Sequence, residues 1–177
     1  MALSTKILPN YTFADYLQWE GEWELIEGIP YAMSPMPSPR HQSIAGKVHS
    51  EFLIEIRKKG CRCEVYQPID LKVDENTVVH PDLLVVCPPI EKQFLDFAPE
   101  LVVEILSPST REKDKITKLE LYQNFRIKYY LIIDPENNSI AYYRLDAEGK
   151  YEALSSIETF DLKDNCTISP DLSSIWS

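Results

Sequence analysis

Three charged residues lie where the sequence pattern calls for apolar side chains. Glu104 stands inside the most apolar run of the chain, residues 101–106. Asp82 directly precedes a second apolar run, residues 83–86, and Lys118 lies in the middle of the apolar stripe of a predicted helix. Burying a charge without a partner is costly, so each of these residues needs a counter-charge, contact with water or a ligand.

Two carboxylates at neighbouring strand ends and a lysine on a buried helix face suit metal-assisted hydrolysis of a phosphodiester. Carboxylate oxygens are hard ligands that favour Mg²⁺ or Mn²⁺. The cation polarises the phosphate, and a lysine orients the attacking water or stabilises the developing charge. Structural explanations remain open: Lys118 pairs with Glu104 or with Asp114 one turn earlier, or extends its ammonium to water, and Asp82 is an ordinary strand-start residue.

Two further residues are weaker candidates. His41 lies on the apolar face of the first long predicted helix, where a histidine is more often a core or cap residue than a ligand. Glu27 alternates with Trp23 and Leu25 along a predicted strand, just before Gly28. Neither residue identifies a site alone, but both are carried forward as candidates.

The positions of these residues depend on the elements that periodicity and turn signals predict. We expect a capping box at residues 109–112 to open the last long helix. Helices are predicted at 12–19, 40–59 and 109–125, and strands at 22–27, 31–34, 61–66, 69–73, 79–87, 101–106, 129–133, 140–145 and 151–154. This order predicts one α/β (α+β) domain over residues 1–177, in which helices flank a mixed central β-sheet and further hairpin strands lie near both ends.

Composition narrows the function classes. With 28 acidic and 18 basic residues the net charge is −10, so binding to nucleic acid needs a local basic patch or a metal ion. The sequence has no nucleophile elbow and no glycine-rich phosphate loop. It has no apolar run long enough for a membrane helix or a signal peptide, so we expect a cytoplasmic protein.

The four cysteines do not form a zinc-binding pattern. Cys61 and Cys63 are separated by a single residue, whereas zinc motifs use wider spacing and a second pair. We expect all four cysteines, including Cys87 and Cys166, to be reduced thiols in a reducing cytoplasm.

Several short motifs follow one another along the chain. They are Glu24-Leu-Ile-Glu-Gly28, His41, Pro81-Asp82, Glu104-Ile-Leu-Ser-Pro-Ser-Thr110, Asp114, Lys118-Leu-Glu-Leu-Tyr122 and Tyr130-Leu-Ile-Ile-Asp-Pro135. This set resembles the Uma-type restriction endonuclease family of the PD-(D/E)XK nuclease superfamily, from about Thr12 to Leu145. The resemblance implies a restriction-endonuclease-like core, consistent with the predicted mixed sheet.

The resemblance also implies roles for individual residues. Asp82 and Glu104 would be the two metal-binding acids, with the backbone carbonyl of Ile105 as a third ligand. The superfamily lysine would stand two residues after Glu104, where this chain has Leu106. In this family the lysine is placed on the following helix, at the position of Lys118. Less specifically, Glu27 would be a further acid near the metal and His41 a contact to the phosphate or leaving group.

We therefore expect a Mg²⁺- or Mn²⁺-dependent DNA endonuclease in which Asp82, Glu104 and Lys118 carry the chemistry. DNA binding should be weak and salt-sensitive, and a homodimer would strengthen it and suit the cutting of two strands. Alternatives are a catalytically inactive nuclease-fold binding or regulatory module and a hydrolase of another phosphodiester. The basic residues available for the DNA backbone are Arg40, Lys47, Arg111, Lys113 and Lys115.

Overall fold

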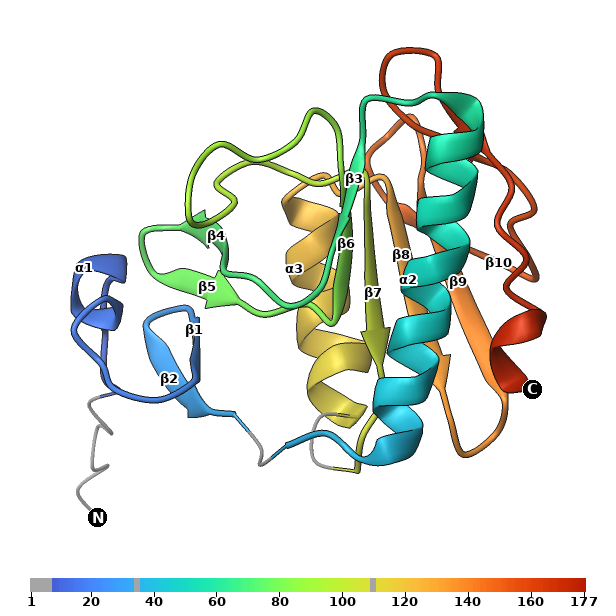
Figure 1. The fold of residues 1–177 in the computed structure, drawn as a ribbon. Helices are drawn as coiled ribbons and strands as arrows, with labels where there is room; N and C mark the ends of the chain where they lie inside the picture. The colour runs from blue at the N-terminus through green and yellow to red at the C-terminus, as the bar shows by residue number, and fades with distance from the viewer. Residues whose placement is uncertain (1–7, 34–35, 109–110) are drawn as a thin grey trace.

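A computed structural model describes residues 8–33, 36–108 and 111–177, and most of its strands lie in two sheets (Figure 1). The larger sheet has six strands in the order β10-β9-β8-β7-β6-β3, and the smaller has four in the order β2-β1-β5-β4. The strands of the larger sheet are β3 (Glu64–Tyr66), β6 (Leu83–Val86), β7 (Leu101–Ile105), β8 (Tyr129–Asp134), β9 (Ser139–Leu145) and β10 (Tyr151–Leu154). Those of the smaller sheet are β1 (Trp23–Ile26), β2 (Ile29–Ala32), β4 (Leu71–Asp74) and β5 (Thr77–Val79).

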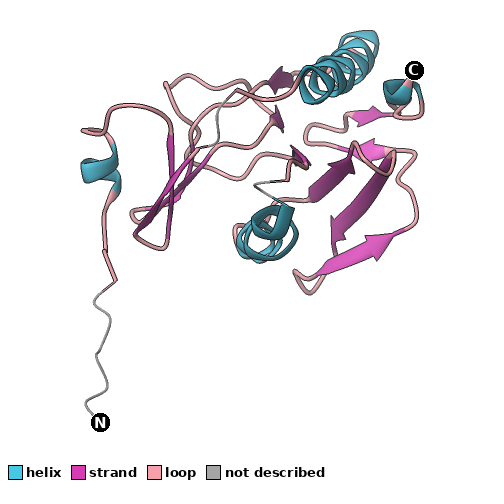
Figure 2. Ribbon diagram, turned by 90° about the horizontal axis from the view of Figure 1, so that it is seen from below, coloured by secondary structure: helices cyan, strands magenta, loops and turns pink. Residues whose placement is uncertain are grey.

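The larger sheet is mixed, as predicted. β7 and β8 run parallel, while every other neighbouring pair in this sheet is antiparallel. All residues of β6, β7 and β8 are buried, which explains why these strands read as continuous apolar runs. The helix α2 (Pro39–Lys59) lies on one face of the sheet and α3 (Lys118–Asn124) lies on the other (Figure 2). The predicted mixed sheet flanked by helices is thus confirmed.

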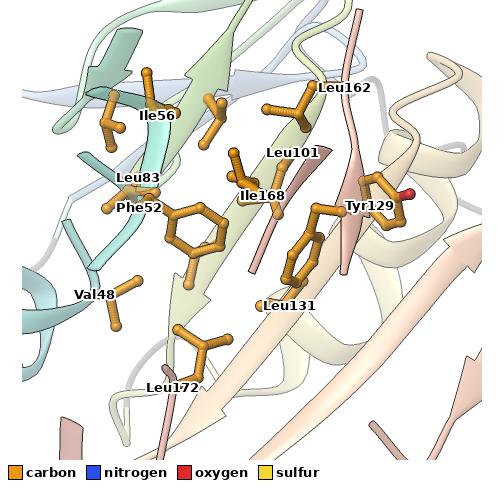
Figure 3. Close-up of a cluster of buried hydrophobic side chains, with 14 of the residues drawn as sticks. Val48, Phe52, Ile56, Leu83, Leu101, Tyr129, Leu131, Leu162, Ile168 and Leu172 are labelled. Atoms are coloured by element: carbon orange, nitrogen blue, oxygen red, sulfur yellow. The ribbon is translucent and has the colours of Figure 1, made fainter. Parts of the chain in front are cut away.

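The helix α2 has the ends that its sequence predicts. The Ser38 side chain caps the first turn by accepting a hydrogen bond from the His41 amide, and Gly60 ends the helix at φ 66°. Its apolar stripe packs on the sheet together with the C-terminal segment, which contains β11 (Phe160–Asp161), β12 (Thr167–Ile168) and the 3₁₀ turn η2 (Ser174–Trp176). Figure 3 shows Phe52 of α2 among side chains of the sheet and of this segment.

A second core cluster lies on the opposite face of the larger sheet. Here Tyr122 of α3 packs with Val102 and Tyr130, and the smaller sheet adds Ile26 and further apolar residues. Because side chains alternate along a strand, Glu104 is on the same face of β7 as Val102 and therefore points toward α3. The position of Glu104 is thus fixed by the strand register.

The helical segment before α3 contains a π-helical turn, η1 (Lys113–Thr117), that periodicity did not predict. Turns of this kind are rare and occur frequently at functional sites. The helix was expected to begin with a capping box at residues 109–112, but Ser109 and Thr110 lie outside the described residues.

The cysteine prediction is wrong. The structure contains two disulfides, Cys61–Cys166 and Cys63–Cys87, and no free cysteine among the described residues. The second disulfide follows from strand register: β3 pairs with β6 through Glu64 and Val86, so the next pair along the ladder is Cys63 and Cys87. Sequence spacing alone cannot reveal such a pairing, because it depends on which strands become neighbours.

Two element predictions also need correction. The run 79–87 was expected to be one strand, but it divides into the end of β5 and the whole of β6, which belong to different sheets. The residues between them, 80–82, carry the chain from one sheet to the other. The first helix, α1 (Phe13–Tyr16), is capped by Thr12 as expected but ends before residue 19. No helix in the described part of the chain is both long and apolar enough to cross a bilayer.

Candidate active site

The predicted acids meet where β6 begins and β7 ends. Leu83 pairs with Val103, so the antiparallel register continues to Asp82 beside Glu104. The amide of Ile105 donates a hydrogen bond to Asp82 Oδ2 at 2.7 Å, which fixes this carboxylate at the end of β7. Asp82, Glu104 and Ile105 all line a cavity of about 1250 Å³ between the two sheets and the helices.

Lys118 is almost fully buried and is surrounded by carboxylates. Its Nζ lies 2.9 Å from Glu24 Oε1, 2.9 Å from Glu104 Oε1 and 3.5 Å from Asp114 Oδ1. Burial acts to lower the pKa of the ammonium, but the charges of Glu104, Glu24 and Asp114 outweigh it and raise the pKa well above its ordinary value. The lysine is therefore held in its charged form at the inner end of the cavity.

Glu104 lies in the most apolar part of this cluster. Its side chain is 3% exposed, and Oε1 accepts hydrogen bonds from Lys118 Nζ at 2.9 Å and from the Tyr122 hydroxyl at 2.6 Å. Burial raises the pKa of Glu104 well above its ordinary value; the charge of Lys118 opposes this rise, and the nearby charges of Asp114, Asp82 and Glu24 add to it. Neither hydrogen bond uses Oε2, the other oxygen of this carboxylate.

Sequence reasoning missed Glu24, the acid from the smaller sheet. It is 1% exposed and binds Lys118 and Lys113 through its side chain, while Oε1 also accepts a hydrogen bond from the amide of His80 at 3.1 Å. Burial acts to raise its pKa, but the charges of Lys118 and Lys113 prevail and lower the pKa to about 2. The alternation of β1 was an available signal, because Glu24 shares its strand face with the buried Ile26.

Glu27 does not join the site. The strand β1 ends at Ile26, and Glu27 enters the turn toward β2 with a left-handed φ of 51°, followed by Gly28 at φ 76°. Its side chain is exposed and does not line the cavity. The structure therefore does not bring Glu27 to the other acids, because β1 ends one residue earlier than predicted.

His41 contacts two of the predicted metal-binding residues, Asp82 and Ile105. Its Nε2 is 3.1 Å from the Ile105 carbonyl and 3.3 Å from Asp82 Oδ2. Burial acts to lower the pKa of the imidazole, but the hydrogen bond and charge of Asp82, with the Ile105 carbonyl, raise it above its ordinary value. The structure thus brings His41, Asp82, Glu104, Ile105 and Lys118 together around one cavity.

The donor set fits a cation that keeps water ligands. Within the described residues, no group of three or more His, Cys, Asp or Glu side chains is arranged to hold a metal ion. Asp82 and Glu104 use Oδ2 and Oε1 for the contacts given above, so these contacts leave one oxygen of each carboxylate unused. One or two carboxylates combined with water and substrate phosphate are the usual protein ligands of Mg²⁺.

Four of the five basic residues expected to contact DNA are bound to other parts of the chain. Lys113 pairs with Glu24, Lys47 contacts the carbonyl of Ser177, Arg40 contacts Asn138, and Arg111 pairs with Asp134 and Glu136. Lys115 is exposed. The described part of the molecule therefore presents little free positive charge near the cavity.

Comparison with known proteins gives a consistent result. The Uma2 family model, described as "Putative restriction endonuclease", matches residues 13–176. The "Uncharacterized protein slr1290" of Synechocystis sp. (strain ATCC 27184 / PCC 6803 / Kazusa) is 31% identical over 157 residues, which cover 83% of this chain and 80% of that protein. A crystal structure from Anabaena variabilis ATCC 29413, described as "a putative nuclease belonging to DUF820", has a TM-score of 0.71 and 17% identity, covering 93% of this chain and 97% of the other.

Proposed function

Since this chain belongs to the Uma2 family of restriction-endonuclease-like proteins, we propose that it is a Mg²⁺- or Mn²⁺-dependent DNA endonuclease. The observation that carries the proposal is the meeting of Asp82 and Glu104 at neighbouring strand ends, with Lys118 Nζ 2.9 Å from Glu104 Oε1. The structural relative from Anabaena variabilis, described as "a putative nuclease", shares the fold on which this arrangement rests.

In the proposed reaction, Asp82, Glu104 and the carbonyl of Ile105 would hold the cation. When bound, the cation would polarise the scissile phosphate and offset the charge that develops on it. Lys118 serves as a hydrogen-bond donor that orients the attacking water or stabilises that charge, because three carboxylates keep its ammonium protonated. A lysine held in this way does not act as the general base.

The remaining residues of the cluster position these groups. Glu24 holds Lys118 from the side of the smaller sheet, and Tyr122 holds Glu104 from α3. His41 contacts both Asp82 Oδ2 and the Ile105 carbonyl, so we propose that it sets their orientation. We propose that Glu24, and not Glu27, is the further acid near the metal-binding residues.

The experiment that tests the proposal is cleavage of plasmid and single-stranded DNA with Mg²⁺, Mn²⁺ or EDTA. We expect cutting that requires the metal and disappears in Glu104→Gln. Glu120→Gln is the matched control, because Glu120 is an exposed acid on α3 and should retain activity. Cutting that persists in EDTA, or that survives in Glu104→Gln, would contradict the proposal.

A second candidate function has one observation in its favour. Glu104, Lys118 and Tyr122 satisfy one another without a metal ion, as a purely structural ion pair would. In that case the protein is a nuclease-fold binding or regulatory module. Absence of cleavage with every metal, combined with intact DNA or protein binding, would favour this function.

We further propose that the chain acts as one nuclease-like domain and associates as a homodimer, which would allow two strands to be cut. We also propose a cytoplasmic location, where a nuclease of this kind meets DNA, although disulfides such as Cys61–Cys166 and Cys63–Cys87 are uncommon in that compartment. Light scattering in solution tests the dimer directly, since a monomer mass at working concentration excludes it.

A further inference from the structure

Two arginines bind the same turn of the chain, the connection between β8 and β9; Arg40 lines the cavity, and Arg111 pairs with Glu136, which lines it as well. Arg40 Nη2 donates a hydrogen bond to Asn138 Oδ1 at 2.7 Å. Arg111 binds Asp134 Oδ2 at 2.9 Å through Nη1 and Glu136 Oε2 at 2.7 Å through Nη2. Arg40 and Glu136 both line the cavity that contains Asp82 and Glu104.

The two acids of this turn differ in how firmly they are held. Asp134 is 9% exposed in its side chain and accepts further hydrogen bonds from the amide of Glu136 and the side chain of Asn137. The Glu136 side chain is 67% exposed, and within the described part of the chain its ion-pair partner is Arg111. Asp134 is therefore a fixed anchor for Arg111, whereas the carboxylate of Glu136 can leave at little cost.

We propose that Arg40 and Arg111 form a phosphodiester-binding site and that Glu136 occupies it until a nucleic-acid phosphate replaces the carboxylate. The site would hold the backbone of the strand whose scissile phosphate lies in the cavity, so it rests on the proposed nuclease function. It also extends that function, because it assigns the backbone contact to two named arginines and a regulatory role to one acid.

The chemistry of both partners supports this exchange. A guanidinium presents a planar fork of donors that matches phosphate as well as carboxylate oxygens. An exposed ion pair contributes little net free energy, so replacing Glu136 by a phosphate loses little. Arg40 lies in the first turn of α2, where the helix dipole adds a favourable field for an anion.

The exchange would also supply positive charge for the DNA backbone on a protein whose net charge is negative. The chain has a net charge of −10, Lys113 is already paired with Glu24 in the cavity, and Lys47 contacts the carbonyl of Ser177. Groups that release a weakly held partner are therefore a source of positive charge for the backbone, beside the exposed Lys115. Arg111 has such a partner, and Arg40 is bound to a neutral amide that a charged phosphate can displace.

The test measures binding of a short fluorescent oligothymidylate by anisotropy in EDTA, so that cleavage does not interfere. Glu136→Gln should tighten binding by about two- to five-fold, the equivalent of an exposed ion pair. Glu158→Gln, which removes the same charge from an exposed position after β10, should leave affinity unchanged. Arg111→Gln should weaken binding by about ten-fold, the equivalent of a charge-assisted hydrogen bond.

The double variant Arg111→Gln/Glu136→Gln decides the mechanism. If Glu136 acts by occupying Arg111, its effect on affinity should vanish when Arg111 is already replaced. Equal tightening in both backgrounds would overturn the proposal, because it would show only a general loss of negative charge. Arg40→Gln provides a second arginine variant, and circular dichroism checks that each variant is folded.

The outcome is separable from that of the nuclease assay. Metal-dependent cutting by the wild type, with no effect of Glu136→Gln on affinity, would refute the displacement of Glu136 by phosphate and would still support the nuclease function. Tighter binding by Glu136→Gln without cutting by any variant would support the phosphate site and refute the nuclease. Absence of oligothymidylate binding by every variant would refute the phosphate site.

Discussion

Glu24 and Glu104 come from different sheets, yet each places its Oε1 atom 2.9 Å from the same ammonium group, Lys118 Nζ. The smaller sheet, the larger sheet and α3 thus converge on one buried lysine. The cluster that we propose as the catalytic centre is also the polar link between the two sheets. Changes in this cluster should therefore affect stability as well as activity.

Lys118→Met should destabilise the protein by about 3–5 kcal/mol, because it leaves buried carboxylates without their counter-charge. Glu24→Gln should act in the same direction, and the loss in the double variant should be smaller than the sum, since both residues belong to one network. Urea unfolding measures all three. The exposed neighbour Glu22→Gln should change stability by less than about 0.5 kcal/mol, and an equal loss in that control would remove the special role of Glu24.

Mg²⁺ or Mn²⁺ should raise the melting temperature, because a cation that binds the folded chain stabilises it by mass action. At a concentration about one hundred times Kd the gain is about 2.7 kcal/mol. Asp82→Asn should abolish the shift in a thermal scan, while Asp96→Asn, which alters an acid paired with Lys92, should keep it. A shift of equal size in both variants would place the cation elsewhere.

Asp134 should make the free energy of unfolding depend on pH in acid solution. Arg111, with Asn137 and the Glu136 amide, lowers the pKa of Asp134 from 3.8 to about 2. A lowered pKa means that the stabilisation is complete above about pH 4 and is lost as the pH falls toward 2. In urea titrations, Asp134→Asn should remove this part of the slope. Arg111→Gln should reduce this slope without removing it, because Asn137 and the Glu136 amide still bind Asp134, and a wild-type slope in both variants would contradict the assignment.

The two disulfides should contribute unequally to stability. Cys61–Cys166 closes a span of 105 residues and Cys63–Cys87 a span of 24, and a longer loop restricts the unfolded chain more. Removing the first with Cys61→Ser/Cys166→Ser should cost about 4–5 kcal/mol, and removing the second with Cys63→Ser/Cys87→Ser about 3 kcal/mol. Urea unfolding with and without reductant measures both losses. Unchanged stability after reduction of the wild type would mean that the thiols are reduced in solution.

Periodicity located most of the elements, because the pattern of apolar residues is what packs them. It found α2 with both of its ends, and it identified β6, β7 and β8 as buried strands. It could not divide residues 79–87 between two sheets, since Val79 and Leu83 are equally apolar and only their partners differ. The disulfides escaped prediction for the same reason, which is that strand neighbours are set by tertiary structure.

The candidate site was predicted through its misplaced charges. Glu104 and Lys118 stood out because each interrupts an apolar face, and the structure joins them at 2.9 Å. Glu24 satisfied the same criterion, since it shares a face of β1 with the buried Ile26, but it was not singled out. Glu27 was chosen instead on the assumption that the strand continues through it, whereas the backbone turns there and leaves this acid exposed.

The connection from β5 to β6 joins the two sheets beside the cavity and limits how far they can move apart there. The strand β5 ends at Val79 and β6 begins at Leu83, so His80, Pro81 and Asp82 form the whole connection there. The connection is also tied to both sheets, because the His80 amide donates a hydrogen bond to Glu24 Oε1 of β1 and Asp82 Oδ2 accepts one from the Ile105 amide of β7. The two sheets are therefore held together at this crossing, beside the acid that we propose as a metal ligand. Under the proposed nuclease function, nucleic acid would meet a cleft that is already formed here, and the ease with which a strand deforms would influence which sites are cut.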